Sequence, residues 1–173
     1  AFARNSLVLA LPGSNETAGE VAGSYTDVIT YKLQDTYWND YVGEVNALTS
    51  AQLQFIHEVH ARTFHLHGHE PYLNLAFFAE IARTLGDALM VKLAMRGNEP
   101  VAAAVFLVSG SVLFGRYWGA IAEFHSLHFE ACYHQGIEYC IAHGLSRFEP
   151  GTQGEHKVVR GFEPSQVWSA HYV

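Results

Sequence analysis

Helical spacing of apolar residues is the first pattern along the chain. Over residues 49–68, apolar side chains recur every three or four positions, with Thr49 or Ser50 as the N-cap and a glycine as the stop. A second helix is predicted from Pro71 to about Leu85, with the proline in its first turn. These two segments predict a helix pair.

Runs typical of β-strands follow the helix pair. Residues 88–96, 99–109 and 111–119 are rich in strand-forming side chains and are separated by turns at Gly97 and Gly110. Two tight turns in succession predict an antiparallel meander.

The longest helical pattern follows the meander, over residues 123–144. Its apolar residues form one stripe that a glycine ends, and Glu130, His134 and Glu138 share the opposite face, which we expect to be solvated. Three further strands are predicted, and they cover residues 25–33, 145–149 and 165–173.

The predicted order is strand, helix, helix, three strands, helix, strand, loop and strand, which is neither an all-helical bundle nor a regularly alternating parallel sheet. It resembles the α+β fold of acyl-CoA N-acyltransferases of the general N-acetyltransferase (GNAT) type. In that fold a mixed, mostly antiparallel sheet is flanked by helices and splays at its middle strands to admit an acyl donor. We expect residues 25–173 to form this domain and residues 1–24 to be a flexible lead-in or linker.

The composition is that of one soluble domain, with 173 residues, 49% hydrophobic and 16% charged. Lys and Arg number 10 against 17 Asp and Glu, a net charge of −7, which disfavours general DNA or RNA binding. The two cysteines, Cys132 and Cys140, lie about 12 Å apart along one predicted helix, so they are not expected to pair. Unpaired cysteines and the shortness of the early apolar run, Leu7–Leu11, indicate a cytoplasmic protein without a membrane span.

The segment 148–164, FEPGTQGEHKVVRGFEP, concentrates glycines and titratable side chains. Glu149, Glu155 and His156 are each candidate general bases for acyl transfer to an amine. Lys157 and Arg160 are candidates for binding a phosphate or carboxylate of the donor or acceptor by charge. Gly151 and Gly154 are candidates for binding through backbone N–H groups, because glycine lets the backbone approach a ligand closely. The alternative is a structural turn whose charges are merely solvated.

Two other groups of residues are candidates for chemistry. Arg116 and Tyr117 end a predicted strand, where they could contact a phosphate and stack on a substrate; the alternative is an aromatic plug in the core. Residues 57–70 contain many of the 11 histidines, but only Val59 separates Glu58 from the next histidine, so the zinc-protease motif is absent. We expect no metal, and a histidine-bound metal protein is kept as an alternative.

Several stretches resemble one known family. FGRYWG (114–119), the segment 128–164, SAHYV (169–173) and PYLNLAFFAEI (71–81) are similar to predicted bacterial N-acyltransferases concerned with peptidoglycan biosynthesis or recognition, which are related to FemAB-type aminoacyl transferases. The resemblance covers about residues 49–173.

The resemblance implies transfer of an acyl or aminoacyl group to an amine, such as that of a peptidoglycan precursor. The partners implied are a small-molecule acyl donor and an amine acceptor. Because GRYWGAIAEFHS (115–126) lacks the glycine-spaced loop of acetyl-CoA-dependent members, acyl-CoA and aminoacyl donors both stay open. Family members often carry two such domains in tandem, and this chain resembles the second, so an N-terminal acyltransferase-like domain is a further expected partner. The rival function is a non-catalytic module that binds a cell-wall precursor or peptide.

Overall fold

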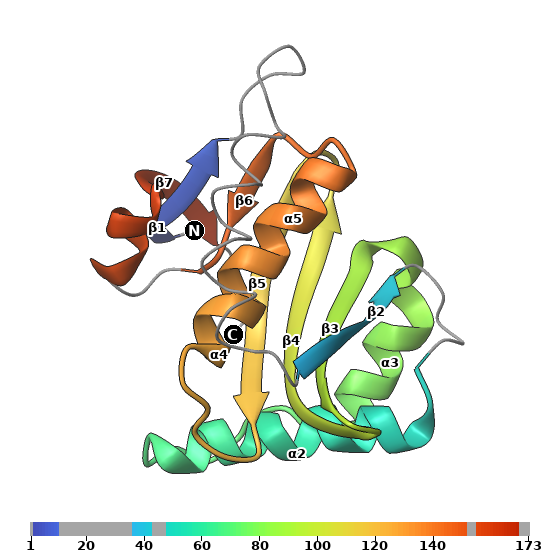
Figure 1. The fold of residues 1–173 in the computed structure, drawn as a ribbon. Helices are drawn as coiled ribbons and strands as arrows, with labels where there is room; N and C mark the ends of the chain where they lie inside the picture. The colour runs from blue at the N-terminus through green and yellow to red at the C-terminus, as the bar shows by residue number, and fades with distance from the viewer. Residues whose placement is uncertain (1, 11–35, 43–47, 152–154, 170–173) are drawn as a thin grey trace.

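The computed structural model describes residues 2–10, 36–42, 48–151 and 155–169 (Figure 1). Strands in these ranges form one seven-stranded sheet in the order β2-β3-β4-β5-β6-β1-β7. The strands are β1 Phe2–Ala10, β2 Thr36–Val42, β3 Leu89–Arg96, β4 Glu99–Ser109, β5 Val112–Ala120, β6 Arg147–Glu149 and β7 Glu163–Ser169. Neighbouring strands are antiparallel except β5 and β6, which are parallel. The fold is therefore the predicted α+β fold with a mixed, mostly antiparallel sheet.

Helices lie on both faces of this sheet (Figure 1). They are α2 Ser50–Leu66, α3 Leu75–Leu85, α4 Leu127–Phe129 and α5 Gln135–Ala142. Between α4 and α5 the chain continues through a π-helical turn, Glu130–His134, so that residues 127–142 form one continuous helix. Short 3-10 segments cover Gly86–Ala88 and Glu155–Arg160.

The helix pair was predicted with one boundary wrong. Thr49 caps α2 as expected: its hydroxyl accepts a hydrogen bond from the Gln52 backbone N–H at 3.2 Å, and its own N–H donates to the Gln52 side chain at 2.7 Å. α3 begins at Leu75 and not at Pro71, because the Asn74 side chain accepts from the Phe77 N–H at 2.9 Å and caps the helix there.

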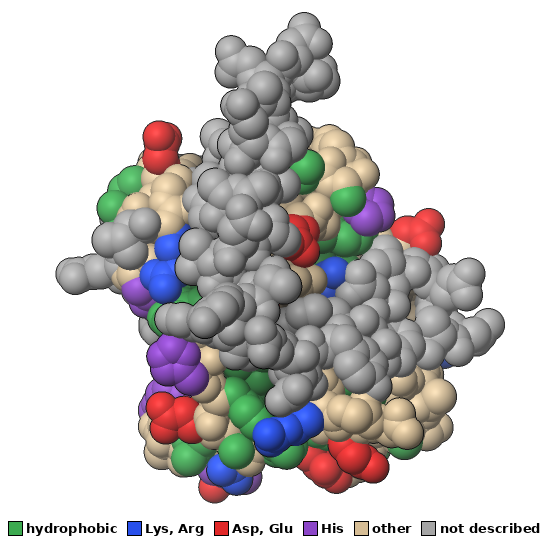
Figure 2. Space-filling model, viewed as in Figure 1, with side chains coloured by type: hydrophobic (Ala, Val, Ile, Leu, Met, Phe, Trp, Pro, Cys, Tyr) green, Lys and Arg blue, Asp and Glu red, His purple; other side chains and the backbone are tan. Residues whose placement is uncertain are grey.

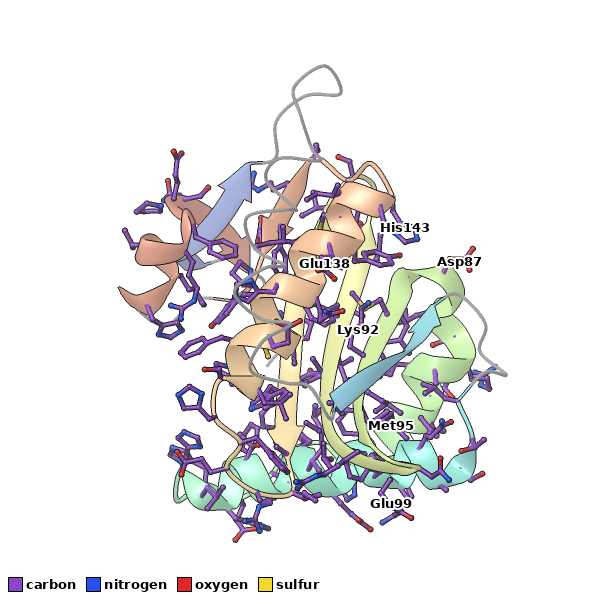
Figure 3. All side chains as sticks on the ribbon, in the orientation of Figure 1. Asp87, Lys92, Met95, Glu99, Glu138 and His143 are labelled. Carbon is purple, nitrogen blue, oxygen red and sulfur yellow. The ribbon has the colours of Figure 1, made fainter. Side chains whose placement is uncertain are left out.

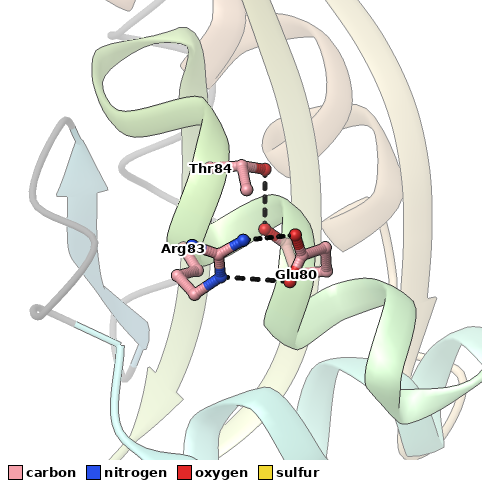
Figure 4. Close-up of polar contacts among 3 residues, drawn as sticks. All are labelled: Glu80, Arg83 and Thr84. Atoms are coloured by element: carbon pink, nitrogen blue, oxygen red, sulfur yellow. Dashed lines mark hydrogen bonds and ion pairs between the residues drawn. The ribbon is translucent and has the colours of Figure 1, made fainter.

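An ion pair lies on the exposed face of α3 (Figure 4). The Arg83 guanidinium donates to both carboxylate oxygens of Glu80, at 2.5 and 3.1 Å, and the Thr84 hydroxyl donates to the Glu80 carbonyl at 2.7 Å. The hydrogen bond from Arg83 lowers the pKa of Glu80. Both charged side chains are solvated, so the pair serves the helix surface and contributes little to stability.

Strand alternation divides the core into two layers. Met90 faces the helix of residues 127–142 together with Phe106 and Phe148, whereas Val91 and Leu93 face α2 and α3. The predicted meander of β3, β4 and β5 is confirmed, and it forms the centre of both layers.

Two strands lie where the sequence predicted irregular chain. Phe2–Ala10, inside the expected lead-in 1–24, pairs with β7 and β6. Thr36–Val42 pairs with β3 and follows the predicted strand 25–33, in a stretch where the sequence predicted no strand. Partners so far away in sequence leave no local signal of the pairing. Residues 11–24 and the strand predicted at 25–33 lie outside the described residues.

The approach of α2 to β5 can be tested at Gly119. A Cβ at this glycine would overlap the Val59 carbonyl oxygen, so α2 can lie on β5 only because residue 119 has no side chain. We expect Gly119→Ala to lower the free energy of unfolding by about 2 kcal/mol, measured by urea denaturation. Gly110→Asn is the control, because its φ of +58° suits asparagine and nothing lies within 4 Å of the added Cβ. Equal stability of Gly119→Ala and wild type would contradict the packing described.

Candidate active site

The sheet opens between β5 and β6. The two strands pair over only three residues of each, Val112–Phe114 with Arg147–Glu149, while β5 continues to Ala120. The register of β4 and β5 also shifts here, since Val105 pairs with Tyr117 and Phe106 with Gly115, which leaves Arg116 as the extra residue of a β-bulge. The second half of β5 therefore borders open space on its β6 side.

A cleft of about 1260 Å³ occupies this opening. Its lining comes from β5 and the loop after it, from the helix of residues 127–142, from the segment after β6 and from the end of α2. The lining side chains include Arg62, His67, Arg116, Tyr117, Trp118, Glu123, His128, Tyr133, His156 and Lys157. A narrower pocket of about 200 Å³ shares part of this lining and reaches Cys132. Figure 2 shows histidine side chains gathered on the left of the view, between α4 and the C-terminal end of α2.

Five of the residues predicted from sequence lie together on this cleft. Arg116 and Tyr117 reach it from β5, and Gly151, His156 and Lys157 reach it from the segment after β6. Arg116 lies at the bulge, and Gly151 adopts a φ of +106°, a conformation that favours glycine. The glycine-rich segment thus folds against the bulged strand.

Two other predicted residues, Glu149 and Arg160, lie outside the lining of the cleft. The Glu149 carboxylate is paired with Arg147 at 3.0 Å and is outside the cleft lining. The Arg160 guanidinium stacks 3.9 Å from the centre of the Phe129 ring and donates to the His156 carbonyl at 2.7 Å. Of Glu155 only the backbone is described, and Gly154 lies outside the described residues. The catalytic and binding roles of all these residues stay predictions.

A hydrogen bond links Tyr133 to His156 inside the cleft. The Tyr133 hydroxyl oxygen and His156 Nε2 are 2.9 Å apart. Burial is the main cause that raises the pKa of Tyr133 to about 12, so the phenol keeps its proton near neutral pH. Burial, followed by the charges of Lys157 and Arg160, lowers the pKa of His156, which favours the neutral imidazole. The pair can therefore hold and pass a proton without carrying a net charge.

Lys157 is a buried cation beside this pair. Its ammonium donates to the Gly151 carbonyl at 2.8 Å and lies 6.0 Å from the centre of the Tyr133 ring. Only 2% of the residue is exposed, and burial lowers its pKa. A cation desolvated in this way is suited to an anionic group that enters the cleft.

Sequence reasoning missed His128 and Tyr133. The helical period allows either Cys132 or Tyr133 on the apolar stripe, and a buried tyrosine in such a stripe gives no sign of its contact with His156. His128 stood in an aromatic stretch without a recognisable motif. A π-helical turn was the missing signal, because it inserts one extra residue and often marks functional sites.

The same turn makes the prediction of a solvated polar face wrong. Glu130 is only 5% exposed and accepts a hydrogen bond from the Gln135 amide at 2.6 Å, a spacing of five residues that matches the π-helical turn. Burial raises the pKa of Glu130. Figure 3 shows Glu138 on α5 and Lys92 on β3 of the sheet that this helix covers. The predicted polar face of the helix therefore carries polar side chains toward the sheet.

The histidine-rich stretch packs partly into the core. The His60 ring lies within 5.3 Å of the Phe64, Phe78 and Tyr117 ring centres, and His65 pairs with Glu70 at 3.5 Å. In the part of the chain that the structure describes, no three His, Cys, Asp or Glu side chains are grouped to hold a metal ion. Both cysteines are free thiols, as predicted. None of the described helices is long and apolar enough to cross a membrane.

The splayed sheet with a helix layer on each face defines an acyl-CoA N-acyltransferase-like fold. The chain belongs to the FemAB-like family, described as peptidoglycan biosynthesis/recognition, which it matches over residues 38–173. The predicted family resemblance is confirmed.

Solved structures show the same fold at low sequence identity. The crystal structure of FemX superposes with a TM-score of 0.66 at 12% identity, over 94% of this chain and 59% of that one. L-PGS from Bacillus licheniformis gives 0.57 at 7% identity, over 87% and 47% of the two chains. A conserved protein of unknown function from Bacteroides thetaiotaomicron gives 0.51 at 9%, over 94% and 58%. This chain thus spans about half to three-fifths of the length of these proteins, and no curated protein sequence matches it.

The pKa of His128 predicts an acid-sensitive fold. Burial and then the charges of His156, Lys157 and Arg160 lower this pKa from 6.5 to about 4. Between these values the unfolded chain holds more protons on the imidazole than the folded chain, so the free energy of unfolding falls as the pH drops. We expect the imidazole to account for about 2 kcal/mol of loss between pH 7 and pH 4.5. In urea unfolding at both pH values, the free energy of unfolding of His128→Phe should fall less than that of the wild type, by that amount. Equal losses in the two proteins would contradict the burial of His128.

Proposed function

We propose that the chain is an N-acyltransferase domain that transfers an acyl or aminoacyl group to an amine in the cleft beside β5. The observation that carries this proposal is the opening of the sheet after Phe114, into which the Tyr133–His156 pair and Lys157 face together. Membership of a family described as peptidoglycan biosynthesis/recognition supports it.

The charge of the cleft favours an anionic donor. Although the whole chain has a net charge of −7, the cleft lining contains Arg62, Arg116 and Lys157 against the single carboxylate of Glu123 among its described residues. Acyl-CoA and aminoacyl esters of RNA both carry phosphates, which guanidinium and ammonium groups bind. Arg116 and Lys157 are the proposed phosphate anchors, and the Tyr117 ring in the same cleft lining offers a stacking surface.

The Tyr133–His156 pair would protonate the leaving group. When the amine attacks and the tetrahedral intermediate collapses, the leaving sulfur or oxygen needs a proton. Tyr133, which stays protonated, donates that proton, and His156 Nε2 lies close enough to return one to the phenol. Of the three bases predicted from sequence, only His156 has a described side chain on the cleft, and its Nε2 is taken by Tyr133.

The acceptor proposed is the amine of a peptidoglycan precursor, a compound class that the family description suggests. A second acyltransferase-like domain, preceding this one in a longer protein, would complete the acceptor side. The word recognition in the same description favours one alternative, a module that binds such a precursor through this cleft without turnover.

Transfer separates the enzyme from the binding module. Purified protein is incubated with acetyl-CoA, longer acyl-CoAs or aminoacyl-RNA and with a peptidoglycan precursor, and mass spectrometry detects the new amide. We expect transfer by the wild type and about a 100-fold lower kcat in Tyr133→Phe, because one proton donor is lost. Binding of the precursor with no transfer from any donor would contradict the enzyme and favour the module.

Donor binding can be followed separately by thermal shift. We expect the donor to raise the melting temperature of the wild type and to lose this effect in Lys157→Ala, because the buried ammonium is the proposed phosphate anchor. Arg83→Ala removes a cation from the exposed face of α3 and should leave the shift intact. A full shift in Lys157→Ala would mean that the donor binds elsewhere.

A further inference from the structure

His128 lies at the junction between the wide cleft and the narrow inner pocket, and its ring belongs to the lining of both. It stands at the start of the helix of residues 127–142, opposite the bulged part of β5. We propose that His128 is the catalytic base that takes the proton from the attacking amine. This inference rests on the proposed function and adds a residue that none of the sequence motifs indicated.

Aromatic neighbours fix the imidazole in this position. Its centre lies 5.4 Å from the centre of the Trp118 ring, 5.5 Å from that of Phe129 and 5.6 Å from that of Tyr133. The three rings come from β5, from α4 and from the π-helical turn, so the imidazole is held from both walls of the opening. Rings of this kind contact its carbon and nitrogen atoms without occupying a lone pair in a hydrogen bond.

The hydrogen bonds of the cleft histidines distinguish their roles. His156 uses Nε2 for Tyr133, and His67 uses Nδ1 for the Thr63 carbonyl at 2.7 Å. His128 makes no hydrogen bond to any residue that the structure describes, so none of those residues competes with a ligand for its ring nitrogens. It is therefore the cleft histidine best placed to accept a proton from a substrate.

Burial and nearby positive charges keep His128 neutral. Tyr133 and Cys132 face it from its own helix, Arg116 and Tyr117 line the same pocket from β5, and a cluster of cations lies on the segment after β6. Burial is the largest cause that lowers its pKa to about 4, followed by His156, Lys157 and Arg160. A phosphate bound at Lys157 would offset the charge of that lysine and strengthen the base when the donor is in place.

The residues on the cleft and solvent water together balance the protons of the reaction. The amine nitrogen attacks the acyl carbonyl, a C–N bond forms and the carbonyl oxygen becomes an oxyanion. His128 accepts one N–H proton from the nitrogen. The oxyanion then re-forms the carbonyl and expels the thiolate or alkoxide, which takes the Tyr133 proton. His156 relays a proton from water to the phenolate, since its Nε2 gives up one proton while its Nδ1 takes one from water. The imidazolium of His128 releases its proton to water, so every residue regains its starting charge.

The first test compares His128→Phe with wild type in the transfer assay. Phenylalanine keeps an aromatic ring between the same neighbours and removes both nitrogens. We expect kcat to fall about 100-fold while the KM for the donor changes less than about threefold, because the base acts after the donor is bound. His65→Gln alters an exposed histidine outside this cleft and should retain the wild-type kcat. His128→Asn serves if circular dichroism shows that His128→Phe is unfolded.

Rescue of the lost activity by altered substrates distinguishes a catalytic base from a structural residue. Hydroxylamine, a weakly basic acceptor, loses its proton more readily than an alkylamine, so it should recover much of the loss in His128→Phe. A 4-nitrothiophenyl thioester of the transferred acyl group needs no proton on its leaving group, so it should recover the loss in Tyr133→Phe and not in His128→Phe. Uncatalysed rates are subtracted in both cases.

Three results would overturn the inference. A wild-type kcat in His128→Phe would contradict the role of His128 as the base. The proposed function would stand, because the wild type still transfers the acyl group. Rescue of His128→Phe by the leaving group instead of the amine assigns His128 to the acid side. Absence of transfer by the wild type with every donor removes the proposed function and the role of His128 together.

Discussion

The parallel pairing of β5 and β6 is the constraint on which the rest of the structure depends. It lasts for three residues of each strand, so the sheet must split where β5 continues and β6 ends. The β-bulge at Arg116 turns the free half of β5 at this point, and Gly151 lets the chain after β6 turn back across the opening. The cleft is thus a consequence of strand length and register, before any side chain is considered.

The helix of residues 127–142 converts this opening into a chemical site. Its α5 part packs on the sheet, while its π-helical turn directs Tyr133 toward the segment after β6. The turn is reinforced by the side-chain bond from Gln135 to Glu130, which spans the same five residues as the π-helical backbone bond. Stability and proposed chemistry therefore depend on the same turn, since relaxing it to regular α-helix would rotate Tyr133 and Glu130 away from their partners.

Local patterns were enough to predict the central elements of the fold. The meander and the capped start of α2 rest on turn glycines, strand alternation and a capping residue, all readable within a few positions. The glycine-flanked segment was likewise singled out from sequence as a candidate site, and its His156 and Lys157 lie on the cleft with Arg116, while their roles stay predictions. β1 and β2 could not be predicted in this way, because their partners are distant in sequence. The proposed roles of Tyr133 and His128 depend on a helical irregularity that a fixed 3.6-residue period conceals.

Hydrogen–deuterium exchange tests most directly whether the opening beside β5 is the donor site. Backbone amides of the protein are compared with and without acetyl-CoA, and in a parallel experiment with and without an aminoacyl-adenosine. We expect one of these probes to slow exchange at residues 115–118, 151 and 156–157, since those residues border the cleft. Protection confined to the outer face of α2, around His57 and His65, with unchanged exchange along β5, would contradict the account.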